Sequence, residues 1–163
     1  MIYIERLVMF IVLLLLQVLV LNHIHLYELA MPLPYILYVI TFQQNTPRWL
    51  MLTSSFLLGL LLDFFTNTPG LAAGCLTLMA MLQPYLLNVM VSRDIADSLP
   101  ISSATLGFGK FSTISAIMIS AYCLVFFALE AFSFFDWQLW LLRTVCSSVL
   151  TLLLIVSVEK IRS

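Results

Sequence analysis

The fold is decided by residues 50–71, LMLTSSFLLGLLLDFFTNTPGL. An apolar run ends there at Asp63, a short polar stretch follows, and apolar sequence resumes at Leu71. A carboxylate inside a membrane-spanning segment costs roughly 3 kcal/mol on insertion scales, and it is normally paired or placed against water. Asp63 therefore marks either a functional site or a structural lock between two apolar helices.

Composition identifies the environment of the chain. Of its 163 residues, 63% are hydrophobic and only 9% are charged, and the mean hydropathy is +1.10. A soluble domain of this size cannot bury so much apolar surface. The net charge of -1, without any basic run, argues against nucleic-acid binding. The sequence predicts one all-α integral membrane domain over residues 1–163, with no soluble catalytic module.

Six apolar segments predict six transmembrane helices, since a span needs about 20 mainly apolar residues. They cover roughly residues 7–21, 31–43, 49–65, 69–91, 111–132 and 138–158. The first is expected to be retained and not cleaved as a signal peptide. The second begins Met31-Pro32-Leu33-Pro34 and is short, so we expect a tilted or partial span. Residues 93–109 are a predicted cytoplasmic linker.

Basic residues predict the orientation. Six of the seven fall on one side of an alternating path: Arg6, Arg48, Arg93, Lys110, Lys160 and Arg162. The connections on the other side contain no Lys or Arg. Cytoplasmic loops are enriched in these residues. Both termini are therefore predicted to be cytoplasmic, with residues 22–29 and 133–137 outside.

Arg143 is the exception to this orientation. It lies near the outer end of the sixth span, at the membrane depth where Asp63 and Glu130 end their own spans. Because an unpaired arginine is costly at that depth, we expect an ion pair of Arg143 with Asp63 or Glu130. The alternative is that Arg143 extends outward past Trp137 and Trp140 to reach water.

Small residues four apart predict close helix packing. Ser55 and Gly59 form one such pair, and Gly70 and Gly74 form another. This spacing lets two helix backbones approach each other in lipid.

Capping and kinking are expected around the fourth span. Asn67 or Thr68 is predicted to cap its N-terminus, with Pro69 at the first helical position. Asp63 lies several residues upstream, so it is not expected to cap this helix. Gln83-Pro84 predicts a kink, because proline lacks a backbone donor and clashes with the preceding turn. Gln83 is expected to satisfy the freed carbonyl or face a cavity.

Residues that could carry chemistry are few. His23 and His25 have no third strong ligand, so no metal site is expected. Cys75, Cys123 and Cys146 lie in apolar spans without CxxC spacing, which is typical of packing residues. No span contains a histidine to activate a serine, and only one span contains an aspartate of the kind that membrane aspartyl proteases use in pairs. We therefore expect no catalytic residues and no cofactor.

The segment from Gly59 to Ala73 resembles the rod shape-determining protein MreD family, together with residues 17–25, Pro32 and Gln83-Pro84. The resemblance implies a protein of the bacterial inner membrane that binds MreC. It also implies membership of the elongation machinery, which couples MreB filaments to peptidoglycan synthesis by a SEDS-type glycosyltransferase and a class-B penicillin-binding protein. The implied fold is similar to the substrate-binding components of energy-coupling-factor vitamin transporters. Related sequences tend to have a basic residue where Gln83 stands, which leaves Arg143 as the candidate partner of Asp63.

Two function classes remain open. One is a non-enzymatic scaffold that docks the single span of a partner. The other is a small-molecule-binding subunit with an outward pocket bordered by Asp63, Glu130 and Arg143. A vitamin site needs several convergent polar groups, and the sequence shows no dense polar cluster. The scaffold is therefore the favoured interpretation.

Overall fold

The computed structural model describes residues 1–20, 23, 30–43, 45–92, 101, 103–132 and 136–162. These residues form helices and no strand, which confirms the all-α prediction for the described part of the chain. The helices are α1 (Ile2–Leu19), α2 (Ile36–Ile40), α3 (Arg48–Thr66), α4 (Leu71–Met90), α6 (Ser103–Leu106), α7 (Phe108–Ala131) and α8 (Trp137–Arg162).

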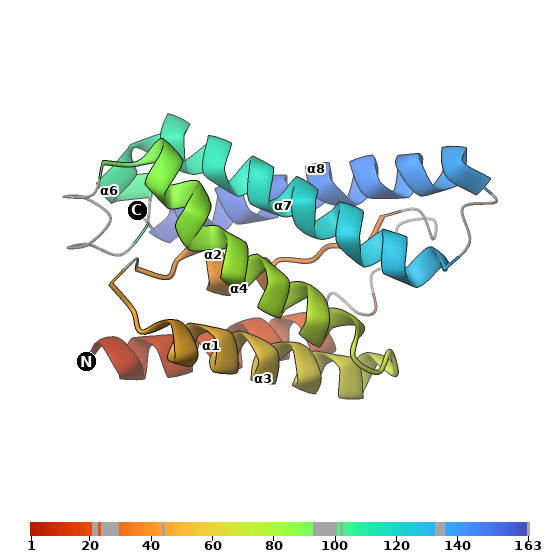
Figure 1. Cartoon of the computed structure of the whole chain (residues 1–163), viewed down its shortest axis with the longest axis horizontal. Coiled ribbons are helices and arrows are strands. Elements are labelled where there is room, and N and C mark those ends of the chain that lie inside the picture. The colour runs from red at the N-terminus through yellow and green to blue at the C-terminus, as the bar shows by residue number, and fades with distance from the viewer. Residues whose placement is uncertain are drawn as a thin grey trace.

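Four helices are long and apolar enough to cross a membrane: α3, α4, α7 and α8. At 1.5 Å per residue they are about 28–39 Å long, which matches a hydrocarbon core of about 30 Å. The chain is thus consistent with a membrane protein. The two termini lie at one end of the bundle, and the turn between α3 and α4 lies at the other (Figure 1).

The long helices have polar residues inside and apolar residues outside. α8 buries Thr144, Ser147, Thr151, Ile155 and Glu159, and α3 buries Ser55, Gly59 and Asp63 among its apolar contacts. The outward positions between them are mostly apolar. Lipid tails are as apolar as leucine, so the hydrophobic effect does not drive helices together inside a membrane. Helices there associate through close packing and polar contacts. This pattern is the one expected of a bundle surrounded by lipid.

The segment at residues 31–43, expected to be a short, tilted or partial span, does not form a helix long enough to cross a membrane. Only Ile36–Ile40 is helical there, a length of about 8 Å. Pro32 and Pro34 explain the late start, because each proline lacks a backbone N–H and restricts the residue before it. All but one of residues 30–42 are buried. The segment runs through the middle of the bundle, where α2 contacts α1, α3, α4 and α7 (orange in Figure 1).

The predicted linker 93–109 contains the short helix α6, which packs on α7. Residues 93–100 and 102 lie outside the described residues, and so does most of the predicted outer segment 22–29. The same is true of residues 133–135 in the second predicted outer segment. The inside and outside assignments therefore stay predictions.

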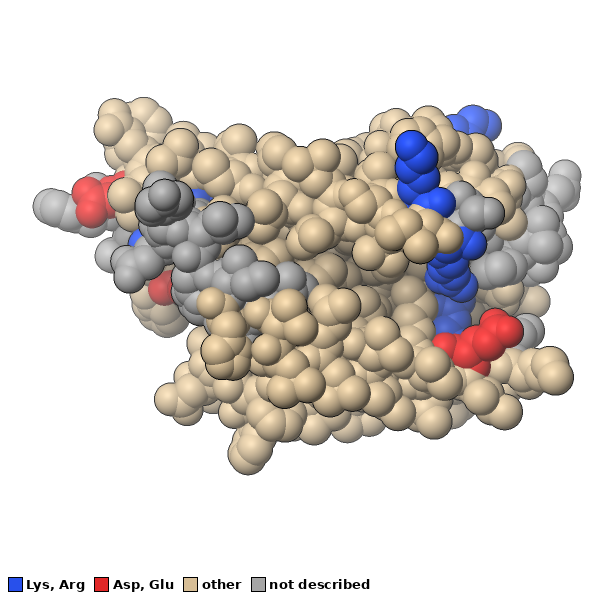
Figure 2. Space-filling model, turned by 180° about the vertical axis from the view of Figure 1, so that it is seen from behind, with Lys and Arg blue, Asp and Glu red and all other residues tan. Residues whose placement is uncertain are grey.

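Charge and tryptophan positions divide the bundle into two ends. Lys and Arg side chains gather in a column at one end of the visible face (Figure 2), which is the end where the termini lie in Figure 1. The exposed Trp49 begins α3 at this end, and the exposed Trp137 begins α8 at the opposite end. Tryptophan is enriched at both membrane–water interfaces, so the two residues fit the two boundaries of a bilayer.

Candidate functional site

The corner between α3 and α4 is built around Asp63, whose side chain is only 4% exposed. Its Oδ1 accepts hydrogen bonds from the Ala72 N–H at 2.8 Å and from the Thr68 hydroxyl at 3.0 Å. Its Oδ2 accepts one from the Ala73 N–H at 2.9 Å. Both carboxylate oxygens are thus occupied by the first turn of α4.

These contacts make Asp63 the cap of the next helix, and the prediction that it does not cap is wrong. The first N–H groups of a helix have no partner within it, and the helix dipole favours a negative charge there. The chain reaches this geometry because Asn67 and Gly70 adopt left-handed conformations, with φ of 59° and 82°. The two residues turn α4 back so that its N-terminus meets the side chain of Asp63.

The predicted roles of the turn residues are corrected as well. Asn67 is the C-cap of α3. Thr68 donates its hydroxyl hydrogen to Asp63, and Pro69 precedes the helix. The N-cap of α4 is Gly70, which has no side chain to accept a hydrogen bond. A carboxylate from the preceding helix replaces the usual local capping side chain.

Gly59 explains how α4 comes close enough to be capped. A Cβ atom at this position would lie 2.4 Å from Ala73 Cα and 2.6 Å from Ala73 N. Gly59 stands one helical turn before Asp63, on the same buried face of α3. By contrast, Gly74 is exposed and a Cβ there would meet nothing within 4 Å. The two predicted small-residue pairs therefore have different roles.

Arg143 forms neither of the two predicted ion pairs, with Asp63 or with Glu130, among the described residues. Among the described residues, the only hydrogen-bond partners of Asp63 are in its own corner. The half-buried Arg143 borders a different pocket of about 290 Å³, together with Glu130 and Asp136. Its Nε is buried and makes no hydrogen bond within the described part of the chain. The sequence predicted that the two charges lie at a similar height in the membrane. In the structure Asp63 faces the start of α4, whereas Arg143 faces a separate pocket.

The buried segment 30–43 is held by polar side chains at its start. Gln17 donates from Nε2 to the Pro32 carbonyl at 3.2 Å. The N–H groups of Met31 and Leu33 each donate at 3.1 Å to a hydroxyl oxygen on α8, from Ser147 and Thr151 respectively. Non-helical backbone at membrane depth is tolerated only when protein or water satisfies it. The buried polar face of α8 serves this purpose.

The end of the same segment is held from α4 and α1. Gln83 is 1% exposed and donates from Nε2 to the carbonyls of Phe42 at 2.8 Å and Ile40 at 3.3 Å. Arg6 donates from Nη2 to the Thr41 carbonyl at 2.6 Å and lies over the Phe42 ring. Gln83 thus satisfies carbonyls that α2 leaves free, while α4 continues as helix through Pro84.

Glu159 is a structural acid that the sequence analysis missed. Its side chain is 1% exposed, and Oε1 accepts a hydrogen bond from the Ser103 N–H at 3.0 Å, at the start of α6. The signal was available, because Ser147, Thr151 and Glu159 recur at multiples of four residues and mark one inward face of α8.

One cavity lies beside the Asp63 corner, with a volume of about 260 Å³. Its polar lining includes Gln17, Tyr35, Thr66, Thr68 and Glu130. The Oε1 atom of Gln17 is buried and has no hydrogen-bond partner among the described residues. Deeper in, the hydroxyls of Tyr35 and Tyr122 share a hydrogen bond of 2.6 Å. Glu130 borders both this cavity and the Arg143 pocket.

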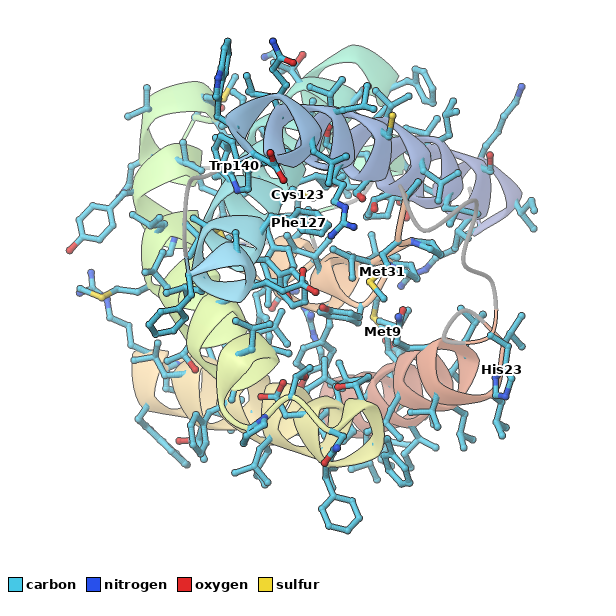
Figure 3. All side chains as sticks on the ribbon, turned by 90° about the vertical axis from the view of Figure 1, so that its right-hand side faces the viewer. Met9, His23, Met31, Cys123, Phe127 and Trp140 are labelled. Atoms are coloured by element: carbon cyan, nitrogen blue, oxygen red, sulfur yellow. The ribbon has the colours of Figure 1, made fainter. Side chains whose placement is uncertain are left out.

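Figure 3 looks into the bundle from the end that holds the α3–α4 turn. Met31, Cys123 and Phe127 point into the interior, whereas His23 lies at the periphery. Among the described residues, no group of three or more His, Cys, Asp or Glu side chains could hold a metal ion. The polar groups of this site therefore come mainly from amides, hydroxyls and single carboxylates.

The chain matches no protein-family model, no curated protein and no solved structure.

Proposed function

We propose that this chain is a non-enzymatic membrane scaffold of the MreD type. It binds an MreC-like protein with a single transmembrane span and helps control rod shape and peptidoglycan synthesis in the inner membrane. Its wider partners are MreB, a SEDS-type glycosyltransferase and a class-B penicillin-binding protein. The proposed topology completes the bundle with α1 as a further span and with both termini in the cytoplasm.

The observation that carries this proposal is that buried polar side chains hold the backbone of the chain itself. Asp63, Gln83, Ser147, Thr151 and Glu159 all hydrogen-bond to the backbone of another segment. A catalytic acid or base must instead reach a substrate atom within hydrogen-bond distance. Asp63, the residue at the centre of the resemblance, has both oxygens bound in the α3–α4 corner. Such a chain is suited to holding a shape for a partner.

α4 provides the candidate docking face for the partner span. Its exposed positions are Gly74, Leu78, Met81, Leu82, Tyr85, Asn88 and Val89. Gly74 leaves open space where a side chain would stand, so a partner helix can approach the backbone closely there. Close van der Waals contact at small residues is a main source of helix association in lipid.

A pull-down of the MreC homologue from the same organism tests the proposal. The wild-type chain should recover it from detergent-solubilised membranes. Gly74→Leu should lower the recovery at least fivefold at equal protein level, because leucine fills the notch without touching the fold. Ser120→Leu is the matched control, since Ser120 is an exposed small residue on α7, and its recovery should equal that of wild type.

A small-molecule-binding subunit is the second candidate, and the cavity beside Gln17 favours it. The Gln17 oxygen, which has no partner in the described part of the chain, and the exposed carboxylate of Glu130 would both accept hydrogen bonds from a ligand that carries N–H or O–H groups. A wild-type preparation that recovers no MreC homologue but retains a small molecule by mass spectrometry would replace the scaffold with this function. If Gly74→Leu leaves the recovery of the MreC homologue unchanged, the docking face does not lie on α4.

A further inference from the structure

The bundle has an open seam between its first and last long helices. α1 packs on α3 and α2, and α8 packs on α7, but α1 and α8 are not major packing partners. Figure 3 shows the two helices standing apart on one side of the bundle. The seam contains a groove of about 640 Å³, bounded by α1, the buried segment 30–43, Ile101 and α8.

The walls of this groove are apolar along most of its length. Val8 and Val12 of α1 and Val158 of α8 border it, and each of these side chains is exposed. The groove therefore offers an apolar track along α1 as far as Leu13, which no described part of the chain covers.

One end of the groove carries two guanidinium groups, Arg6 from α1 and Arg162 from α8. Because both line the same groove, their like charges repel each other. Arg6 is fixed by the Thr41 carbonyl and lies over the Phe42 ring. Arg162 makes no ion pair with any described acid, and Glu5 is the only described acidic residue that borders the groove. An anion between the two arginines would relieve their repulsion.

We propose that this groove binds one anionic phospholipid, with its phosphate between Arg6 and Arg162 and an acyl chain along Val8 and Val12. Basic pockets between transmembrane helices bind anionic lipid headgroups in this way. Guanidinium groups suit phosphate because their N–H groups match its oxygens in pairs. The site is separate from the outward face of α4, and its occupancy does not depend on the proposed scaffold function.

The volume of the groove favours a lipid over a partner helix. A helix about 10 Å across with a rise of 1.5 Å per residue fills roughly 120 Å³ per residue, so the groove encloses only about five residues of helix. A spanning helix has about 20 residues. A lipid acyl chain is thinner than a helix, and the phosphate of its headgroup would meet the two arginines at the end of the groove.

Native mass spectrometry of the full-length protein tests this site. The protein is purified in detergent and titrated with phosphatidylglycerol, and separately with phosphatidylcholine of the same acyl composition. Wild type should bind the first phosphatidylglycerol molecule at least tenfold more tightly than the first phosphatidylcholine molecule. Arg162→Gln should lose this preference, since it removes a free guanidinium without breaking a described contact. Arg48→Gln, which removes a basic residue outside the groove, should keep it.

Two further arms separate the sources of binding. Val12→Trp fills the apolar track and should weaken both lipids, whereas glycerol 3-phosphate, which has no acyl chain, should not displace phosphatidylglycerol. Equal affinity of wild type for the two lipids would overturn the proposal, and so would an unchanged preference in Arg162→Gln. Displacement of phosphatidylglycerol by glycerol 3-phosphate would show that the site binds a phosphate without an acyl chain. A co-purified protein that Val12→Trp removes would show that the groove binds a protein. Either result would also overturn the proposal.

Discussion

Two helical hairpins present acids at the same end of this bundle and treat them in opposite ways. In the α3–α4 hairpin, Asp63 is buried and accepts two hydrogen bonds from the start of α4 and one from the turn before it. In the α7–α8 hairpin, Glu130 and Asp136 are exposed around a pocket that also holds Arg143. The first acid fastens two helices together, whereas the second group of charges borders open space.

The acids of the two hairpins lie at the same end of the bundle and differ in burial, since Asp63 is buried whereas Glu130 and Asp136 are exposed. An exposed carboxylate is satisfied by water or headgroups, so it needs no protein partner. A carboxylate without access to water needs hydrogen bonds from the protein, and the uncapped first turn of a helix supplies them at no further cost to the fold. Variants in the two hairpins should therefore differ sharply in stability.

The largest effect is expected for Asp63→Ala. It leaves the N–H groups of Ala72 and Ala73 without acceptors in a buried corner, and we expect a loss of about 4 kcal/mol of unfolding free energy. Asp63→Asn should lose about half as much, because its carbonyl oxygen still accepts while its amide nitrogen cannot. Unfolding in mixed detergent and dodecyl sulfate micelles measures both losses of unfolding free energy.

Glu130→Ala, at the same end of the other hairpin, is the control and should change the unfolding free energy by less than about 0.5 kcal/mol. A loss for Glu130→Ala as large as that for Asp63→Ala would contradict the comparison.

The next effect is expected for Gly59→Ala. The added methyl group meets the backbone of Ala73, which cannot move aside as a flexible side chain would. Overpacking of this kind costs about 1–3 kcal/mol, and we expect the upper part of that range because separating α4 from α3 also lengthens the Asp63 hydrogen bonds. The same unfolding measurement applies. Gly74→Ala on the open face of α4 is the matched control and should not destabilise. If Gly59→Ala proves as harmless as Gly74→Ala, the helices have room to separate and the tight corner is not required.

The smallest effect is expected for coupling between the two hairpins. Arg143→Gln should cost less than about 1 kcal/mol, because its guanidinium makes no ion pair with Asp63. Combined with Asp63→Asn, the losses should add within about 0.5 kcal/mol, as they do for residues that share no partners. A double-mutant cycle on the same unfolding assay gives the coupling energy. A coupling energy above 1 kcal/mol would restore the ion pair that the sequence suggested.

Hydropathy was sufficient to locate the long helices. The predicted segments 49–65 and 69–91 correspond to α3 (Arg48–Thr66) and α4 (Leu71–Met90), within a few residues at each end. The last two predicted segments, 111–132 and 138–158, likewise correspond to α7 (Phe108–Ala131) and α8 (Trp137–Arg162). This succeeds because the length of an apolar run directly sets whether it can cross the bilayer.

The roles of the polar residues were much harder to predict. The sequence singled out Asp63 as a site or a lock, but its partners were missed, because two left-handed residues decide where the chain turns. The buried segment 30–43 looked like a short span, since its backbone partners Ser147 and Thr151 lie more than 100 residues away. Apolar composition does not distinguish a segment surrounded by lipid from one surrounded by its own chain.

The buried segment also fixes an order of events during synthesis. Residues 30–43 leave the ribosome long before α8, yet two of their backbone N–H groups donate to hydroxyls of α8. Until that last helix arrives, the segment has no complete set of partners at membrane depth and must remain near water or the insertion machinery. A nascent chain that stops before Ser147 therefore lacks the acceptors that hold the start of this segment.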